Sequence, residues 1–224
     1  MTGNTRPAWS GRHPGAPQRE GEPSTTADPV ARRALDLALA RRCVAGDRDA
    51  QLALFRREVD RVHRVLRRIL GGGADVEDAA QDAFLALYRS LSGYRGEALL
   101  ATWIDRITVR TAIAFLRRRT PVASGDADAA ETLADPGPRP DDRLADHELS
   151  QRLYAALGRL DPRQRVAFVL HVIEDHSMAE VAALMGATRV ATKTRVWRAQ
   201  RALERRAARD PVLAALLAAK GGTR

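Results

Sequence analysis

The chain has 224 residues, 45% of them hydrophobic and only 4% aromatic, which allows one or two small domains with an Ala/Leu/Val helical core and disfavours a β-sandwich. The formal net charge of +9 favours a polyanionic partner. Cys43 is the only cysteine, which excludes an internal disulfide and fits a reducing compartment. Because no apolar run approaches the roughly 20 residues of a membrane span and the N-terminus lacks a signal-peptide core, we expect a cytoplasmic protein without membrane insertion.

Residues 1–28 predict a disordered tail. Four prolines and four glycines leave little hydrophobic periodicity in this segment, and its charges cancel, which is typical of disorder. A first helix is expected from Pro29, because proline is favoured at the first helical position. Its apolar face would carry Leu35, Leu39 and Val44 before a glycine breaks it.

A second helix is expected over residues 49–70, where apolar residues recur at helical spacing. They are Leu52, Phe55, Val59, Val62, Leu66 and Ile69. The glycine triplet 71–73 should end this helix. No Gly-Lys-Ser/Thr follows the triplet and no strand precedes it, so we interpret it as a hinge between helices and not as a phosphate loop.

The third expected helix is acidic, with Asp75 as its N-cap. The helix dipole accounts for acids in the first turn, but not for Gln81 and Asp82, which continue one polar ridge. We call this surface the acidic ridge; it consists of Asp75, Asp78, Gln81 and Asp82. The opposite face is apolar and carries Ala79, Ala80, Ala83 and Leu87. On a basic protein, such a ridge suits a basic protein partner better than DNA.

A loop at 92–97 and a helix over about 99–119 follow. The helix carries a second basic stripe at helical spacing, formed by Arg106, Arg110 and Arg117 and reinforced by Arg118 and Arg119. Two residues of the loop, Tyr94 and Arg95, could hold an unstacked base beside this stripe. The alternative is a plain connection with Tyr94 packed over the core, and the sequence leaves both open.

The composition changes sharply over residues 120–148, which hold eight acids against two arginines together with prolines, glycines and alanines. This predicts a flexible acidic linker. The last domain is expected from residue 149, with one helix to about residue 160. Asp161 and Pro162 would then begin a helix over 163–173 as N-cap and first residue. Residues 211–224 are expected to form a short apolar helix or a frayed tail.

Residues 177–209 predict a helix-turn-helix. Ser177 and Glu180 form a capping box, Gly186 suits the left-handed residue after a helix, and Thr188 can cap the next helix. The inward stripe of that second helix is Thr192, Val196, Ala199 and Leu203. Between residues 189 and 209 there are eight basic residues and one acid, which favours insertion into the major groove. The alternative is an ordinary solvated basic helix. However, the helix dipole disfavours positive charge in the first turn, so helix stability alone does not explain the basic residues there.

The sequence shows no enzyme chemistry. Its five histidines are scattered, no Cys/His cluster has zinc spacing, and neither a Gly-x-Ser-x-Gly motif nor a phosphate loop occurs. We therefore expect a protein with no catalytic residues, no metal and no cofactor.

The order of these modules resembles the extracytoplasmic-function (ECF) sigma factors of bacterial RNA polymerase, group IV of the sigma-70 family. The resemblance covers about residues 35–119 and 149–207. Its region-two mark is DVEDAAQDAFLALYRSLSGYRGEALLATW. Its region-four marks are RLDPRQRVAFVLHV and SMAEVAALMGATRVATKTRVWRA. It implies an alternative sigma factor with a region-two domain at 29–119 and a region-four domain at 149–210.

The resemblance also implies roles for residues. The docking helix for the coiled coil of the polymerase's largest subunit would present Asp78, Gln81, Asp82 and Phe84. The loop with Tyr94 and Arg95 would capture a flipped base of the −10 element, and the basic stripe would follow the melted strand. The recognition helix for the −35 element would present Arg189, Lys193, Arg195 and Arg198. Region four would also bind the polymerase flap, the linker would thread toward the polymerase active site, and an anti-sigma factor would hold the protein inactive.

The chain departs from the family pattern where it would read the promoter. Arg110 and Ala114 stand where Asn and Asp are frequent, and residues 190–192 are Val, Ala and Thr where Gly, Thr and Val are usual. The rival functions are a stand-alone helix-turn-helix regulator, which needs no acidic ridge, and an RNA-binding scaffold, whose affinity would follow backbone charge without promoter preference.

Overall fold

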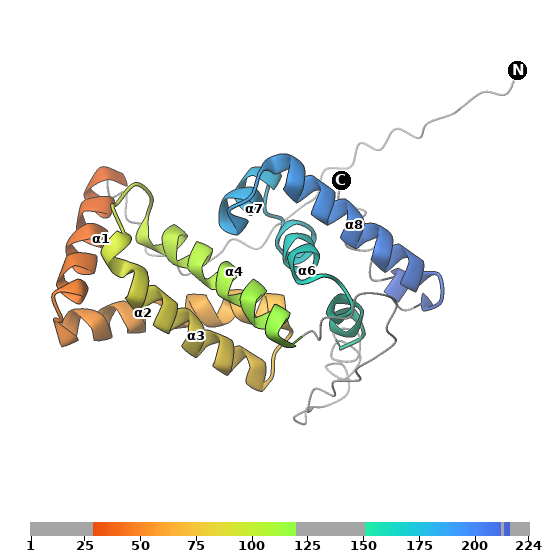
Figure 1. Ribbon diagram of the computed structural model, residues 1–224, viewed down its shortest axis with the longest axis horizontal. Coiled ribbons are helices and arrows are strands. Elements are labelled where there is room, and N and C mark those ends of the chain that lie inside the picture. Colours follow the sequence, from red (N-terminus) through yellow and green to blue (C-terminus); the bar gives the residue numbers. More distant parts are fainter. Residues whose placement is uncertain (1–28, 120–150, 212, 216–224) are drawn as a thin grey trace, which may run out of the picture.

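The computed structural model describes residues 29–119, 151–211 and 213–215 (Figure 1). All regular secondary structure in these ranges is helical. The elements are α1 (Pro29–Val44), α2 (Arg48–Leu70), α3 (Ala74–Ser90), the 3₁₀ turn η1 (Leu91–Gly93), α4 (Leu100–Arg119), α6 (Pro162–Phe168), the π-helical turn η2 (Val169–Ile173), α7 (Met178–Met185) and α8 (Arg189–Ala207). Residues 151–158 are helical as well. The prediction of two helical domains is confirmed, whereas the predicted tail (1–28), the linker (120–148) and residues 216–224 lie outside the described residues.

The first domain is a bundle in which α2, α3 and α4 pack pairwise against one another, with α1 at one end (Figure 1). The face of α3 that enters this bundle carries Ala79, Ala80 and Ala83, all buried. Small side chains let neighbouring helices approach closely, and Leu87 continues the same face with almost no exposed surface. The predicted apolar face of α3 is therefore confirmed.

The buried face of α1 differs from the predicted one. Leu35 and Val44 are 71% and 52% exposed, so the prediction was wrong at both positions. The buried residues are Asp36, Ala40 and Cys43. Helix α1 is therefore rotated so that a carboxylate, and not a leucine, faces the bundle.

The rotation of α1 is explained by the two partners of Asp36. One of its carboxylate oxygens accepts a hydrogen bond from the backbone N–H of Leu100 at 2.9 Å. The other accepts one from the Arg57 guanidinium at 3.1 Å. The first N–H groups of a helix have no partner inside the helix, so α1 supplies a cap for α4 from 64 residues away.

Helix α2 begins and ends within one residue of the prediction, but only its second half buries the predicted residues. Val62, Leu66 and Ile69 are buried, whereas Leu52 and Phe55 are 45% and 39% exposed. In the first half the buried positions are Ala50, Leu54 and Glu58. The apolar side chains that sequence reasoning assigned to the core therefore lie on an outer surface.

The connection between α2 and α3 is set by its glycines. Gly71 ends α2 in the left-handed conformation, with φ of 95°. Gly73, with φ of 81°, occupies the N-cap position of α3. Because the chain enters α3 directly from this glycine, the helix begins at Ala74, and Asp75 lies in the first turn. The prediction of Asp75 as the N-cap was wrong, although an acid in the first turn still suits the helix dipole.

The second domain contains residues 151–158, α6, η2, α7 and α8, with α6 packed along α8. The Asp161 side chain accepts hydrogen bonds from the backbone N–H groups of Arg163 and Gln164, and Pro162 is the first helical residue, as predicted. The predicted helix over 163–173 changes character at Val169, where π-helical bonding begins. Along the same segment, the N–H of Glu174 bonds to the carbonyl of Val169.

The helix-turn-helix forms as its local signals predicted. Both hydrogen bonds of the Ser177–Glu180 capping box are present. Gly186 adopts the left-handed conformation with φ of 59°, and the Thr188 hydroxyl accepts a bond from the Ala191 N–H at 3.2 Å. The two helices are therefore fixed at both ends of the turn.

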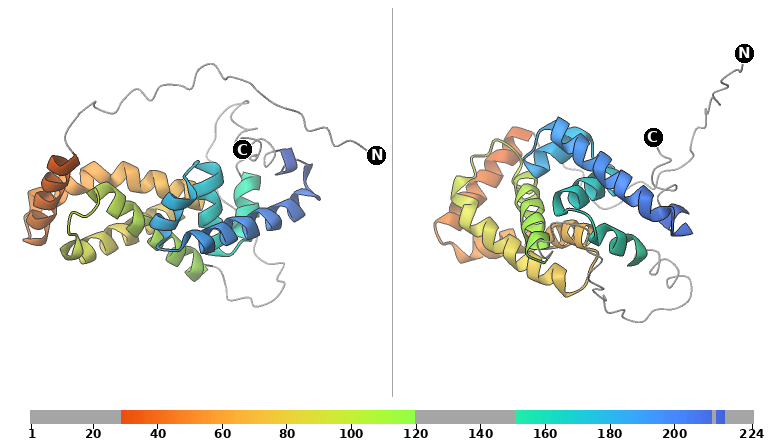
Figure 2. Two further views of the ribbon diagram at one scale, coloured as in Figure 1. Left: turned by 90° about the horizontal axis from the view of Figure 1, so that it is seen from above. Right: turned by 45° about the vertical axis from the view of Figure 1, so that its right-hand side comes forward.

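The two domains are in direct contact. Helix α4 packs against α6 and α7, and α2 contacts η2. Two further views show the helices of the second domain lying along the α4 side of the first (Figure 2). Buried apolar residues of both domains form one continuous core cluster.

We predict that Asp36→Ala lowers the free energy of unfolding by about 2 kcal/mol, because it removes a helix cap and a partner of Arg57 together. Urea denaturation of the full chain measures this. Asp60→Ala, at an exposed position of α2, is the matched control and should change stability by less than about 0.5 kcal/mol. Equal effects of the two substitutions would contradict the capping role.

Candidate nucleic-acid and protein interfaces

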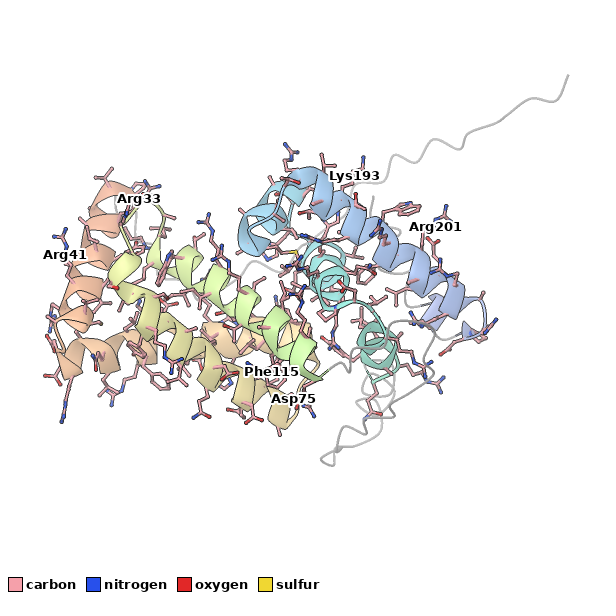
Figure 3. The ribbon with its side chains drawn as sticks, viewed as in Figure 1. Arg33, Arg41, Asp75, Phe115, Lys193 and Arg201 are labelled. Atoms are coloured by element: carbon pink, nitrogen blue, oxygen red, sulfur yellow. The ribbon has the colours of Figure 1, made fainter. Side chains whose placement is uncertain are left out.

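Helix α8 presents most of its predicted contact residues to the outside. Its buried residues are the predicted inward stripe, Thr192, Val196, Ala199 and Leu203. Arg189, Lys193 and Arg198 are exposed, and Arg195 is half-buried at the edge of that stripe. In Figure 3, Lys193 and Arg201 lie on the outer edge of α8, away from the first domain.

The N-terminal end of α8 carries positive charge from two sources. Its first turn contains no acidic residue, so Arg189 adds its charge to the positive end of the helix dipole. The Thr188 cap satisfies one backbone N–H without adding a negative charge. The arrangement suits a phosphate or the acceptor atoms of a base edge.

Sequence reasoning missed two large apolar residues on the same exposed face. Val190 is 78% exposed and Trp197 is 56% exposed. The guanidinium of Arg201 lies 5.8 Å from the centroid of the Trp197 ring, a cation–π contact that orients both side chains. The available signal was the phase of the helix, since Trp197 directly follows Val196 of the inward stripe and therefore points outward.

The acidic ridge of α3 is on the surface, and part of it is already ion-paired. Asp78 and Gln81 are exposed. Asp82 forms an ion pair with Arg118, and Asp75 forms one with Arg119. Figure 3 shows Asp75 near the end of α4 that carries Phe115. Arg118 and Arg119 are therefore ion-pair partners of the acidic ridge. The prediction that they extend the basic stripe was wrong.

An apolar surface adjoins the acidic ridge. Phe84, which was predicted to contact the polymerase, is instead largely buried: it is only 9% exposed and packs against Phe55 with ring centroids 4.7 Å apart. Leu52 and Leu85 are exposed by 45% and 46%. Leu52 and Phe55 also line, together with Tyr88 and others, a hollow of about 710 Å³. We call Leu52, Phe55 and Leu85 the apolar strip; clustered apolar side chains of this kind mark a surface for another protein.

The predicted base-binding loop is only partly open. Tyr94 is 6% exposed; its hydroxyl donates to the carbonyl of Ala98 at 2.7 Å, and its ring lies 5.5 Å from that of Trp103. Arg95 is exposed. Of the two readings of the loop, the structure shows Tyr94 packed over the core. Burial also raises the pKa of the Tyr94 hydroxyl.

The basic stripe of α4 lies on the helix that meets the second domain. Arg117 is exposed, and Arg106 is half-buried. The Nε atom of Arg106 is buried without a hydrogen-bond partner within the described parts of the chain. Arg110 is exposed, but its guanidinium contacts Gly186, where a Cβ atom would lie 2.9 Å from an Arg110 nitrogen. The stripe is thus partly covered by α7.

Family comparisons match both domains. Residues 54–121 match the family model for Sigma-70 region 2, and residues 150–203 match the one for Sigma-70, region 4. The ECF RNA polymerase sigma-E factor of Escherichia coli (strain K12) is 31% identical over 177 residues, which are 75% of this chain and 92% of that protein. The chain belongs to the ECF sigma factors.

Two further similarities accompany this result. The ECF RNA polymerase sigma factor SigM of Mycobacterium tuberculosis (strain ATCC 25618 / H37Rv) is 34% identical over 162 residues, covering 72% of this chain and 79% of SigM. Among solved structures, CnrH in complex with the cytosolic domain of CnrY matches 82% of this chain and 97% of CnrH, with 24% identity and a TM-score of 0.49.

Membership of the family identifies the chain as an alternative sigma factor that directs RNA polymerase to promoters. Its partners are RNA polymerase and promoter DNA. Within the described ranges, no helix is long and apolar enough to cross a membrane. The described His, Cys, Asp and Glu residues form no group of three that could hold a metal ion.

We predict that Tyr94→Ala destabilises this sigma factor by about 3–5 kcal/mol, because it leaves a cavity in the core. Tyr94→Phe should cost only about 1 kcal/mol, since it removes the hydrogen bond to Ala98 alone. Thermal and urea unfolding measure both values. Arg95→Ala, in the same loop but exposed, is the control and should have little effect. A Tyr94→Ala protein as stable as the wild type would show that the ring is not part of the core.

Proposed function

We propose that this sigma factor reads the −35 element with the exposed face of α8. The observation that carries the proposal is the phase of the helix: four buried residues fix one side, and Arg189, Lys193 and Arg198 emerge on the other. The first two turns of a recognition helix contact base edges in the major groove. Val190 and Trp197 add apolar surface, which suits contact with thymine methyl groups.

In this proposal α4 and the preceding loop bind the melted −10 strand. Arg95 and Arg117 are exposed cations at the two ends of this surface, and Arg106 and Arg110 lie between them. Unpairing and flipping a base costs a few kcal/mol, and contacts to the flipped base and the strand backbone offset part of that cost. Tyr94 supports the loop from its buried side, because its ring packs against that of Trp103.

The acidic ridge and the apolar strip together form the proposed site for the coiled coil of the polymerase's largest subunit. Asp78 and Gln81 are free to meet basic residues of that partner, and Phe55 and Leu85 offer apolar contact beside them. The Asp82–Arg118 pair is largely exposed. Exposed pairs contribute only about 0–1 kcal/mol, so a partner's cation can replace Arg118 at little cost.

Three further elements of the proposal rest on membership of the family. The region-four domain also contacts the polymerase flap, and an anti-sigma factor holds the protein inactive until a signal releases it. The protein acts in the cytoplasm and has no catalytic residues of its own, because the polymerase performs the chemistry.

Run-off transcription with purified core polymerase tests the proposal as a whole. The chain should stimulate transcripts from a subset of promoters in a genomic library of its source bacterium, at starts that core polymerase alone does not use. Absence of stimulation on every promoter, with a core preparation that responds to another sigma factor, would contradict it.

For the −35 contact, we predict that Lys193→Ala reduces affinity for the cognate −35 duplex by about 5–150-fold, which corresponds to the roughly 1–3 kcal/mol of one base contact. Affinity for a scrambled duplex should fall much less. Arg205→Ala removes the same charge from the C-terminal end of α8 and should weaken both duplexes alike. Fluorescence anisotropy at fixed salt measures these affinities, and equal losses for Lys193→Ala and Arg205→Ala on both duplexes would exclude base readout by Lys193.

For the polymerase contact, we predict that Asp82→Lys reduces affinity for core polymerase at least tenfold and leaves the −35 duplex affinity unchanged. A lysine there repels basic residues of the partner and also Arg118. Asp60→Lys, the same charge reversal on an exposed site of α2, should bind core polymerase normally. The proposed site would be wrong if both variants bound core polymerase as tightly as the wild type does.

A further inference from the structure

The contact between the two domains is centred on a buried arginine. Arg165 of α6 is 7% exposed. Its Nε donates to the carbonyl of Ile69 at 2.9 Å, and its Nη2 donates to the carbonyl of Leu70 at 3.0 Å. No carboxylate of the described residues forms an ion pair with Arg165. The counter-charge of this cation is therefore the C-terminal end of α2.

The end of α2 is well suited to receive a cation. The last carbonyl groups of a helix lack partners inside the helix, and they carry the negative end of its dipole. Burial lowers the pKa of Arg165 to about 10, so the side chain is still charged at neutral pH. Removing the arginine would leave two buried carbonyls without donors, which is costly.

Two other contacts surround Arg165. The hydroxyl of Tyr154 donates to the carbonyl of Arg68 at 2.9 Å, and its ring covers Gly71 so closely that a Cβ atom there would lie 2.7 Å from a ring carbon. Arg68 also forms an ion pair with Glu174. Together these contacts connect the last turn of α2 to three separate segments of the second domain.

The same packing covers part of α4. Helices α6 and α7 lie against α4, the Arg110 guanidinium contacts Gly186, and the buried Nε of Arg106 has no hydrogen-bond partner among the described residues. These two arginines belong to the stripe that we assign to the melted −10 strand. In contrast, the outer face of α8 is open (Figure 3).

In this arrangement the distance between α4 and α8 is too short to span the two elements of a promoter. Helix α7 contacts both α4 and α8, and packed helices lie about 8–10 Å apart, so α4 and α8 are separated by roughly 20 Å. Promoter elements centred near −10 and −35 are about 25 base pairs apart, or roughly 85 Å at about 3.4 Å per base pair. The docked protein cannot occupy both elements of a straight duplex.

We propose that the docked arrangement is a closed state of the free sigma factor, in which Arg165 locks the second domain onto the end of α2 and covers the part of the strand-binding face of α4 at Arg106 and Arg110. The −35 face of α8 stays accessible in this state. Full promoter binding requires the lock to open. The inference rests on the proposed function only in its assignment of α4 to the melted strand and of α8 to the −35 duplex.

A reversible cross-link tests whether the closed state is inactive. Arg68→Cys and Glu174→Cys, combined in the full chain and joined by a short bis-methanethiosulfonate, which forms a disulfide with each thiol and releases sulfinate, would hold the domains together. Cys43 is 3% exposed, and burial raises the pKa of its thiol, so the engineered thiols should react first. The linked protein should bind the −35 duplex like the unlinked one but support less than a tenth of its run-off transcription, and reduction should restore activity.

Opening the lock should have the opposite effect on the −10 strand. We expect Arg165→Gln to raise affinity of the free protein for a single-stranded −10 oligonucleotide at least tenfold, with an unchanged −35 duplex affinity. Arg163→Gln removes an exposed arginine from the same helix and should change neither. Gly71→Ala should weaken the same contact from the first domain, because Gly71 has a φ of 95° and a Cβ atom there would collide with the Tyr154 ring. It should raise the −10 strand affinity as Arg165→Gln does, and it serves as the second test if Arg165→Gln unfolds the second domain.

The outcomes separate this inference from the proposed function. Full activity of the cross-linked protein, or a −10 strand affinity unchanged in both Arg165→Gln and Gly71→Ala, would overturn the closed state. Loss of −35 duplex binding or of transcription in the wild-type protein would instead overturn the proposed function.

Discussion

The burial of one stripe of α8 is the constraint on which the account of this protein depends. Thr192, Val196, Ala199 and Leu203 have at most 2% of their surface exposed, and a helix can bury only one side against α6 and α7. Every basic residue out of phase with that stripe must then face outward or lie at its edge. The capping residues Ser177 and Thr188 fix where the helices begin, so they also fix which side chains face outward, where the proposed DNA contact would be made. The proposed DNA-binding face thus follows from core packing, without any need for the basic residues to be placed individually.

The first domain separates its partners by charge and by polarity. Its acidic ridge and apolar strip lie on α2 and α3, whereas the basic residues proposed to bind the melted strand lie on α4 and in the loop before it. The ion pairs of Asp75 and Asp82 with the end of α4 moderate this separation, because they neutralise two of the three carboxylates of the ridge. They are exposed and weak, so they do not block a partner. The docked arrangement adds to this separation, since the face proposed to bind the melted strand is the one that the other domain partly covers.

Sequence reasoning was reliable where the determining contacts are local. The capping box of Ser177, the turn at Gly186 and the Asp161–Pro162 start each depend on residues within a few positions of one another, and all three are present. It was wrong where a residue distant in the sequence determines which face of a helix is buried. The face of α1 is set by Asp36, whose partners are 21 and 64 residues away, and no local pattern contains that information. Arg165 looked like an ordinary helix residue for the same reason. Trp197 could have been found from the phase of α8, whereas the state of Tyr94 could not, because both readings of its loop fit the sequence equally well.

Hydrogen–deuterium exchange of the full chain with each partner separately is the most direct test of the division of labour between surfaces. With core polymerase, the account predicts slower exchange in α3 and in the part of α2 that carries the apolar strip. With a −35 duplex alone, it predicts slower exchange at the N-terminal half of α8 and unchanged exchange in α3. Protection of α3 by the duplex, or unchanged exchange of α8 in its presence, would contradict the account.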